Sequence, residues 1–192
     1  ITGFRLAPGG AQQYFGVNPD ITILGKILGG GFPVGAFCGR SELMQHLDAD
    51  LYKRPLYSFH GGTFVGNPVT MTAGLATLRL LEDGLLLNSL NRDGEKVRER
   101  LRDIFESQNI DVQVTGVSSI FNVHFTNEKV TNAKTAYQTD RQELLDYDLA
   151  LITEGVFFLP THNGVLCTVH SKADLEKLFT ETEAYAKNSK KT

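Results

Sequence analysis

The stretch Asp20-Ile-Thr-Ile-Leu-Gly-Lys-Ile-Leu-Gly-Gly-Gly31 decides the fold of the first part of this chain. Its short apolar run, residues 21–24, is rich in β-branched side chains and predicts a buried strand of a parallel sheet. Lys26 follows at the carboxyl end of that strand, where α/β folds place their ligands. The glycines at 29–31 carry no side chains, so the backbone there can pass close to a bulky group.

Two interpretations of Lys26 stay open from the spacing alone. At the edge of an apolar site a lysine loses hydration, which favours its neutral amine, and a neutral amine can form a Schiff base. A lysine beside a glycine-rich loop can also lie on the surface with its charged end in water. Strand-to-glycine turns are common, so both interpretations fit the pattern.

The composition is that of an ordinary globular protein, with 192 residues, 41% hydrophobic and 21% charged. A formal net charge of -3 argues against nucleic acid or an anionic membrane as a partner. No apolar run reaches the length of roughly 18 residues that a transmembrane helix needs. Cys38 and Cys167 lie far apart and form no CxxC motif, so no metal site is expected. The same use of cysteine favours a reduced, cytoplasmic location.

Two units are expected, a partial α/β layer over residues 1–84 and a small α+β domain over 85–192. In the first, a second strand is expected at 33–39, a short helix capped by Ser41, and an irregular loop at 48–66. Asn67-Pro68 then predicts a helix start, with Asn67 as the N-cap and proline at the first helical position. One face of that helix is apolar: it carries Met71, Leu75, Leu78 and Leu81.

The second unit shows helix and strand patterns in turn. A charged segment keeps an apolar helical face: Leu90, Val97, Leu101 and Ile104. Residues 120–125 alternate as a half-buried strand does, and Asp140 is expected to cap a helix that ends near 154. Strands are expected at 155–160 and 165–169. Ser171 and Asp174 form a capping box before the last helix, whose apolar face is Leu175, Leu178, Phe179 and Tyr185.

Several short motifs follow one another in order along the chain. They are Thr2-Gly-Phe-Arg5, Gly-Gly-Ala11, Tyr14-Phe-Gly-Val-x-Pro-Asp20, Leu24-Gly-Lys-Ile-Leu-Gly-Gly-Gly31, Pro33-Val-Gly-Ala36, Gly39-Arg40, Gly62-Thr-Phe-x-Gly-Asn-Pro68 and Ala73-Gly74. This order resembles the carboxyl-terminal part of a class III pyridoxal-phosphate aminotransferase of fold type I. Within that class it is most similar to glutamate-1-semialdehyde 2,1-aminomutases and β-amino-acid aminotransferases. The resemblance implies part of a large cofactor-binding domain over 1–84 and a small carboxyl-terminal domain over 85–192.

The resemblance also implies residue roles. Lys26 is the Schiff-base lysine that holds pyridoxal 5'-phosphate and moves the proton during transfer of an amino group from a small amino-acid or amino-aldehyde substrate. Gly62 and Thr63 match the position that binds the cofactor phosphate of the neighbouring subunit, which implies a homodimer with a shared active site. On its residues alone, Gly62-Thr63 also fits a plain turn before a helix.

The match to the family has two departures. The family's aspartate that pairs with the pyridinium nitrogen belongs to a segment immediately before Ile1, within an amino-terminal half absent here, so this piece alone is expected to be inactive. After Leu159-Pro160, aminomutases carry a longer segment with a glutamate, whereas this chain has only Thr161-His-Asn-Gly164. That difference favours a β- or ω-amino-acid:keto-acid aminotransferase; a non-catalytic fragment is a further alternative.

Some residues keep two interpretations. His162 and Asn163 fit either a substrate contact or a hairpin turn, which Asn-Gly favours. His60 fits either the border of the substrate site or a structural loop histidine. The glycines at 29–31 are interpreted as space for the cofactor. His46, His124 and His170 are expected to be structural.

Overall fold

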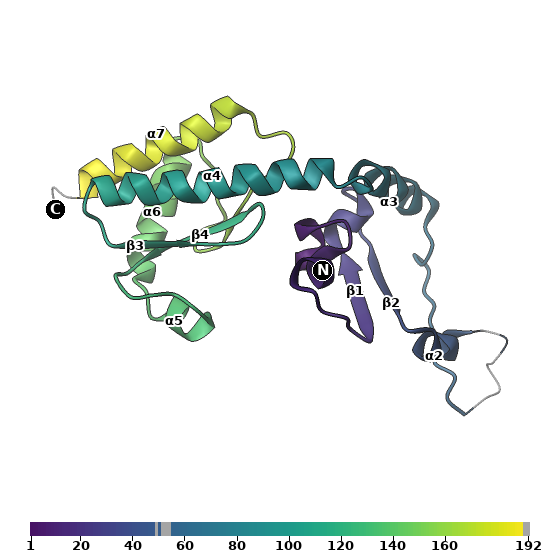
Figure 1. Ribbon diagram of the computed structural model, residues 1–192. Coiled ribbons are helices and arrows are strands. Elements are labelled where there is room, and N and C mark those ends of the chain that lie inside the picture. Colours follow the sequence, from purple (N-terminus) through teal and green to yellow (C-terminus); the bar gives the residue numbers. More distant parts are fainter. Residues whose placement is uncertain (49, 51–54, 190–192) are drawn as a thin grey trace. The chain divides into compact units, whose positions relative to one another are not determined.

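A computed structural model describes residues 1–48, 50 and 55–189 (Figure 1). The chain divides into two compact units, one over Ile1–Leu87 and one from Asn88 onwards. The expected boundary after residue 84 lies close to this division.

The first unit contains a β-hairpin and several short helices. Strand β1 (Ile21–Gly25) pairs antiparallel with β2 (Gly35–Gly39), with Ile21 opposite Gly39. The expectation of a buried strand in a parallel sheet is therefore wrong for this chain. The apolar run identifies a strand but not its partner, and the glycine turn returns the chain to pair with the residues that follow it. The other elements before the loop are η1 (Thr2–Leu6), α1 (Gly10–Phe15), η2 (Lys26–Gly29), α2 (Ser41–Met44) and η3 (Gln45–Leu47).

Helix α3 (Pro68–Leu81) begins as expected. The Asn67 side chain accepts hydrogen bonds from the backbone N–H groups of Val69 and Thr70, at 3.0 and 3.2 Å. Helix α2 begins at Ser41 itself, with no side-chain cap, so the expected Ser41 cap is wrong. In the loop at 48–66, residues 49 and 51–54 lie outside the described residues. The described part from 55 to 66 has turns at 55–56 and 63–66 and no helix or strand.

The apolar face of α3 is only partly buried. Leu81 packs in a small core with Phe4 and Leu87, together with partly buried leucines and Ile27. Met71, Leu75 and Leu78 are exposed instead of forming core. The spacing correctly indicated one apolar face, but burial of that face depends on a surface that the first unit does not supply.

The second unit has the stronger core. Its elements are the main part of α4 (Leu85–Ser107), β3 (Val112–Thr115), β4 (Ile120–Phe125), α5 (Ala133–Tyr137), α6 (Arg141–Thr153), β5 (Gly164–Val165) and α7 (Lys172–Asn188). The strand order is β3-β4-β5, all antiparallel. Figure 1 shows α4 and α7 running beside each other, and an ion pair between Arg100 and Glu183 joins them at 2.7 Å. The expected faces of α4 and α7 and the alternation of β4 are confirmed by the buried cluster.

Helix caps in this unit also follow the sequence. Asp140 accepts from the N–H groups of Gln142 and Glu143, and Ser171 forms a capping box with Asp174. The expected strands at 155–160 and 165–169 are wrong: of these residues, only Val165 belongs to a strand. Their apolar runs suggested strands, but the backbone from 156 to 163 has no regular partner and turns back instead.

Candidate active site

Lys26 stands where β1 passes into η2. It is the first residue of η2 and has a φ of 54°, in the left-handed region. For a residue with a Cβ this conformation costs about 1 to 2 kcal/mol. Such strain persists only where the surrounding structure holds it, and it gathers at functional sites. The backbone therefore marks Lys26 as a candidate functional residue independently of its side-chain chemistry.

The side chain of Lys26 is exposed. It takes part in none of the ion pairs formed among the described residues, so its primary amine is free to react with a carbonyl group. Within the described part of this chain no apolar site encloses the amine, because Lys26 is itself exposed. The expected loss of hydration is therefore not produced by the contacts of this chain.

The glycines after Lys26 make room for helix α3. A Cβ at Gly30 would lie 2.6 Å from the carbonyl oxygen of Ala73, and one at Gly74 would lie 2.6 Å from that of Leu28. Side chains cannot approach backbone so closely, so η2 and α3 pack through their main chains. The structure thus gives Gly30 a packing role against α3, whereas Gly31 faces open space, and the interpretation of these glycines as space for a cofactor stays a prediction.

Gly62 and Thr63 lie in an exposed turn ahead of α3. The N–H of Val65 donates to the carbonyl oxygen of Gly62 at 3.1 Å, which closes the turn around Thr63. A hydroxyl next to exposed backbone N–H groups is a donor set that suits an anion such as phosphate. No hydrogen bond among the described residues joins Thr63 to Lys26, so the structure does not assemble these two residues into one site within the chain.

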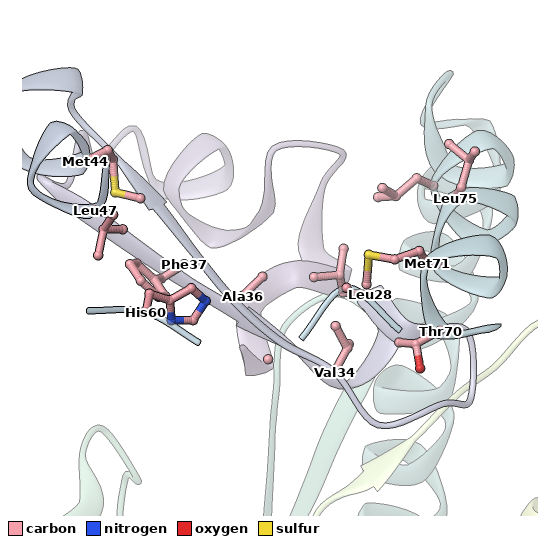
Figure 2. Close-up of a pocket in the computed structure, with 14 residues that line it drawn as sticks. Leu28, Val34, Ala36, Phe37, Met44, Leu47, His60, Thr70, Met71 and Leu75 are labelled. Atoms are coloured by element: carbon pink, nitrogen blue, oxygen red, sulfur yellow. The ribbon is translucent and has the colours of Figure 1, made fainter. Parts of the chain in front are cut away.

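An apolar cavity of about 430 Å³ lies in the first unit, bounded by β2 and α3. Figure 2 shows Leu28 and Met71 at one end and His60 with Phe37 at the other. The two rings meet edge to face, with centroids 5.1 Å apart. Neither Lys26 nor Thr63 lines the cavity. Sequence reasoning missed it, although the apolar face of α3 was the signal that could have found it.

The remaining histidines make local contacts. His124 shares a hydrogen bond of 2.9 Å with the Thr115 hydroxyl across the β3–β4 ladder, and burial lowers the pKa of its imidazole. His170 accepts from the N–H of Cys167 at 3.3 Å. Over residues 1–48, 50 and 55–189, no three His, Cys, Asp or Glu side chains gather as a metal site would require. In the same residues no helix has the length and apolar character needed to cross a membrane.

The fold matches solved structures of transaminases over nearly the whole chain. An ω-transaminase from Sphaerobacter thermophilus superposes with a TM-score of 0.87 at 32% sequence identity, over 99% of this chain and 43% of that one. A β-phenylalanine aminotransferase from Variovorax paradoxus gives 0.87 at 30% identity, over 98% and 43%. The architecture is thus part of fold type I of the pyridoxal-phosphate-dependent transferases, followed by a small α+β unit.

The sequence identifies the family within that class. The family model for aminotransferase class-III matches residues 2–181. A glutamate-1-semialdehyde 2,1-aminomutase from Methanothermobacter thermautotrophicus is 42% identical over 186 residues, which are 96% of this chain. The chain belongs to the class-III aminotransferases, and it spans 42% of the length of that relative.

Proposed function

We propose that the complete protein uses pyridoxal 5'-phosphate to transfer amino groups, with Lys26 as the residue that holds the cofactor. The observation that carries this proposal is the strained backbone of Lys26 at the carboxyl end of β1, in a chain that belongs to the class-III aminotransferases. Strained backbone conformations gather at functional sites, and a covalent attachment point must be held in one orientation.

The donor set of the chain fits this cofactor. Covalent capture of an aldehyde needs a primary amine, and Lys26 offers one that no ion pair among the described residues occupies. When bound, the cofactor ring supplies an electron sink for bond breaking at the substrate Cα. Once the substrate amine has displaced it, the Lys26 amine would carry the proton to and from that Cα.

Gly62 and Thr63 are proposed to bind the phosphate of a cofactor held by a neighbouring subunit. This would make the complete protein a homodimer with shared active sites. Mixing two variants tests the sharing: a Lys26→Ala subunit paired with a Thr63→Ala subunit retains one intact site only if the two residues act in trans. Recovery of activity on mixing, at limiting cofactor, supports the proposal, and a mixture no better than its parts contradicts it.

The proposed reaction is that of a glutamate-1-semialdehyde aminomutase, as in the relative that is 42% identical. A second candidate is transfer between a β- or ω-amino acid and a keto acid, as in the two transaminase structures. The observation that favours this second candidate is the short turn from Leu159 to His162, where the N–H of His162 donates to the carbonyl oxygen of Leu159 at 3.0 Å. The segment that follows it contains no carboxylate to retain an intermediate.

Product analysis of the complete protein separates these reactions. Glutamate-1-semialdehyde alone should be isomerised by an aminomutase, whereas β-phenylalanine should require an added keto acid. Borohydride reduction of the cofactor-loaded protein, followed by peptide mass spectrometry, should place the modification on Lys26. A modification on another lysine, or no cofactor retention at all, would overturn the proposal and leave the alternative of a non-catalytic protein of this fold.

A further inference from the structure

Among the described residues, Asp148 is the one acidic residue in the set of buried polar side chains. It lies on α6, and the residue is only 3% exposed. No ion pair formed within the described part of the chain includes it. Its Oδ2 accepts a hydrogen bond from the backbone N–H of Thr161 at 2.7 Å. A buried acid without a cation is costly to keep, so the contact with Thr161 needs an explanation.

Thr161 sits in a strained turn. Its φ is 59°, in the left-handed region, and the turn around it is closed by the bond between His162 and Leu159. Residues 156–163 belong to no helix or strand. Few backbone hydrogen bonds therefore hold this segment, and the bond to Asp148 links it to the core helix α6.

The segment forms one wall of a cavity of about 500 Å³ in the second unit. Phe157, Leu159 and Asn163 line it from the two sides of the turn, and Leu175 and Leu178 of α7 line it as well. This volume lies within the range of small-molecule sites, about 300 to 1,000 Å³. The position of the Leu159–His162 turn therefore affects the width of this cavity.

We infer that Asp148 is a positioning residue that fixes the Leu159–His162 turn through the N–H of Thr161 and thereby sets the shape of this cavity. The inference does not depend on the proposed function, since it concerns contacts within the second unit alone. A neutral acceptor of the same shape would serve equally well, because the bond requires an oxygen at that place and not a charge. Loss of the oxygen would free the turn.

Hydrogen exchange tests this in the complete protein, read by mass spectrometry on the peptide covering residues 157–163. Asp148→Leu keeps the branched shape but has no acceptor, and we expect exchange of that peptide to rise about fivefold, as loss of an ordinary hydrogen bond implies. Asp148→Asn keeps an acceptor oxygen and should stay within about twofold of the parent protein. Asp146→Leu, at an exposed aspartate on the same helix, is the matched control and should change nothing.

Either of two results would overturn the inference. One is exchange in Asp148→Leu equal to that of the parent protein. The other is Asp148→Asn exchanging as fast as Asp148→Leu, which would mean that the charge of Asp148 holds the turn and that a neutral acceptor does not. If Asp148→Leu fails to fold, Asp148→Ala removes the acceptor with a smaller side chain and should raise exchange of the same peptide. Inactivity of the parent protein toward amino substrates would leave these exchange results unaffected.

Discussion

The hydroxyls of Tyr147 and Thr182 share a hydrogen bond of 2.9 Å in the core of the second unit, where both residues are almost fully buried. The bond joins α6 to α7. Thr182 has a second partner, because its hydroxyl also contacts the carbonyl oxygen of Leu178 at 2.7 Å. Loss of the Tyr147 hydroxyl therefore leaves Thr182 with its bond to Leu178, whereas loss of the Thr182 hydroxyl removes the hydrogen-bond partner of the Tyr147 phenol.

This asymmetry predicts unequal costs. Tyr147→Phe removes one hydroxyl and leaves Thr182 bonded to Leu178, so it should lower the free energy of unfolding by about 1 kcal/mol. Thr182→Val leaves the buried phenol of Tyr147 without an acceptor and should cost about 1 to 3 kcal/mol. Urea denaturation of both variants measures the difference. Equal losses, or a larger loss for Tyr147→Phe, would contradict this assignment of partners.

The left-handed backbone of Lys26 is expected to lower the stability of the protein, whereas its side-chain amine is expected to be required for amino-group transfer. Lys26→Gly should relieve the left-handed conformation and be more stable than Lys26→Ala by up to about 1 kcal/mol. Both variants should lose amino-group transfer, because neither carries an amine. Thermal unfolding gives the first comparison and turnover of the complete protein the second. A Lys26→Ala variant with substantial turnover would remove Lys26 from the reaction.

The main-chain contact between η2 and α3 predicts which glycines tolerate a methyl group. Gly74→Ala places a Cβ against the carbonyl oxygen of Leu28 and should lower the free energy of unfolding by about 2 kcal/mol or more. Gly35→Ala is the matched control, since a Cβ there meets nothing within 4 Å. A calorimetric scan in which both variants melt at the same temperature would show that the helix adjusts freely.

Asp148 predicts a particular dependence of stability on pH. Burial raises the pKa of its carboxyl above the ordinary value, and the bond from Thr161 opposes this in part. The folded protein therefore holds this proton more tightly than the unfolded chain does, so ionisation of Asp148 lowers stability as the pH rises from 3.8 through the raised pKa. Asp148→Asn cannot ionise. Its melting temperature should exceed that of the parent protein at neutral pH, and the gap should close near pH 3.8.

Local signals in the sequence predicted the local structure well. Asn67, Asp140 and Ser171 each act as helix caps in the structure, because a cap needs only backbone N–H groups two or three residues away. The burial of Phe121 and Val123 also followed from alternation along one strand. These features depend on neighbours in the chain, which the sequence lists directly.

The predictions that were wrong concern contacts between residues that lie far apart in the sequence. The apolar side chains of residues 155–160 predicted a strand, yet these residues form none. The N–H of Thr161, directly after them, instead donates to Asp148, 13 residues earlier on α6. Its position after β1 singled out Lys26, but the sequence left open whether its side chain is buried or exposed, because the surroundings of a side chain depend on distant segments. The phosphate-binding role proposed for Thr63 comes from the resemblance to the family, because the turn around Thr63 does not reveal it.

The close contact between η2 and α3 has a mechanical consequence. Because Gly30 and Gly74 let two backbones touch, a displacement of the helix axis is transmitted to the turn that carries Lys26 without side chains to absorb it. The same helix begins at Pro68, a few positions after Thr63. Helix α3 therefore contacts the turn that follows Lys26 and begins shortly after Thr63 in the sequence. Replacements along α3 are expected to shift both residues without altering either side chain.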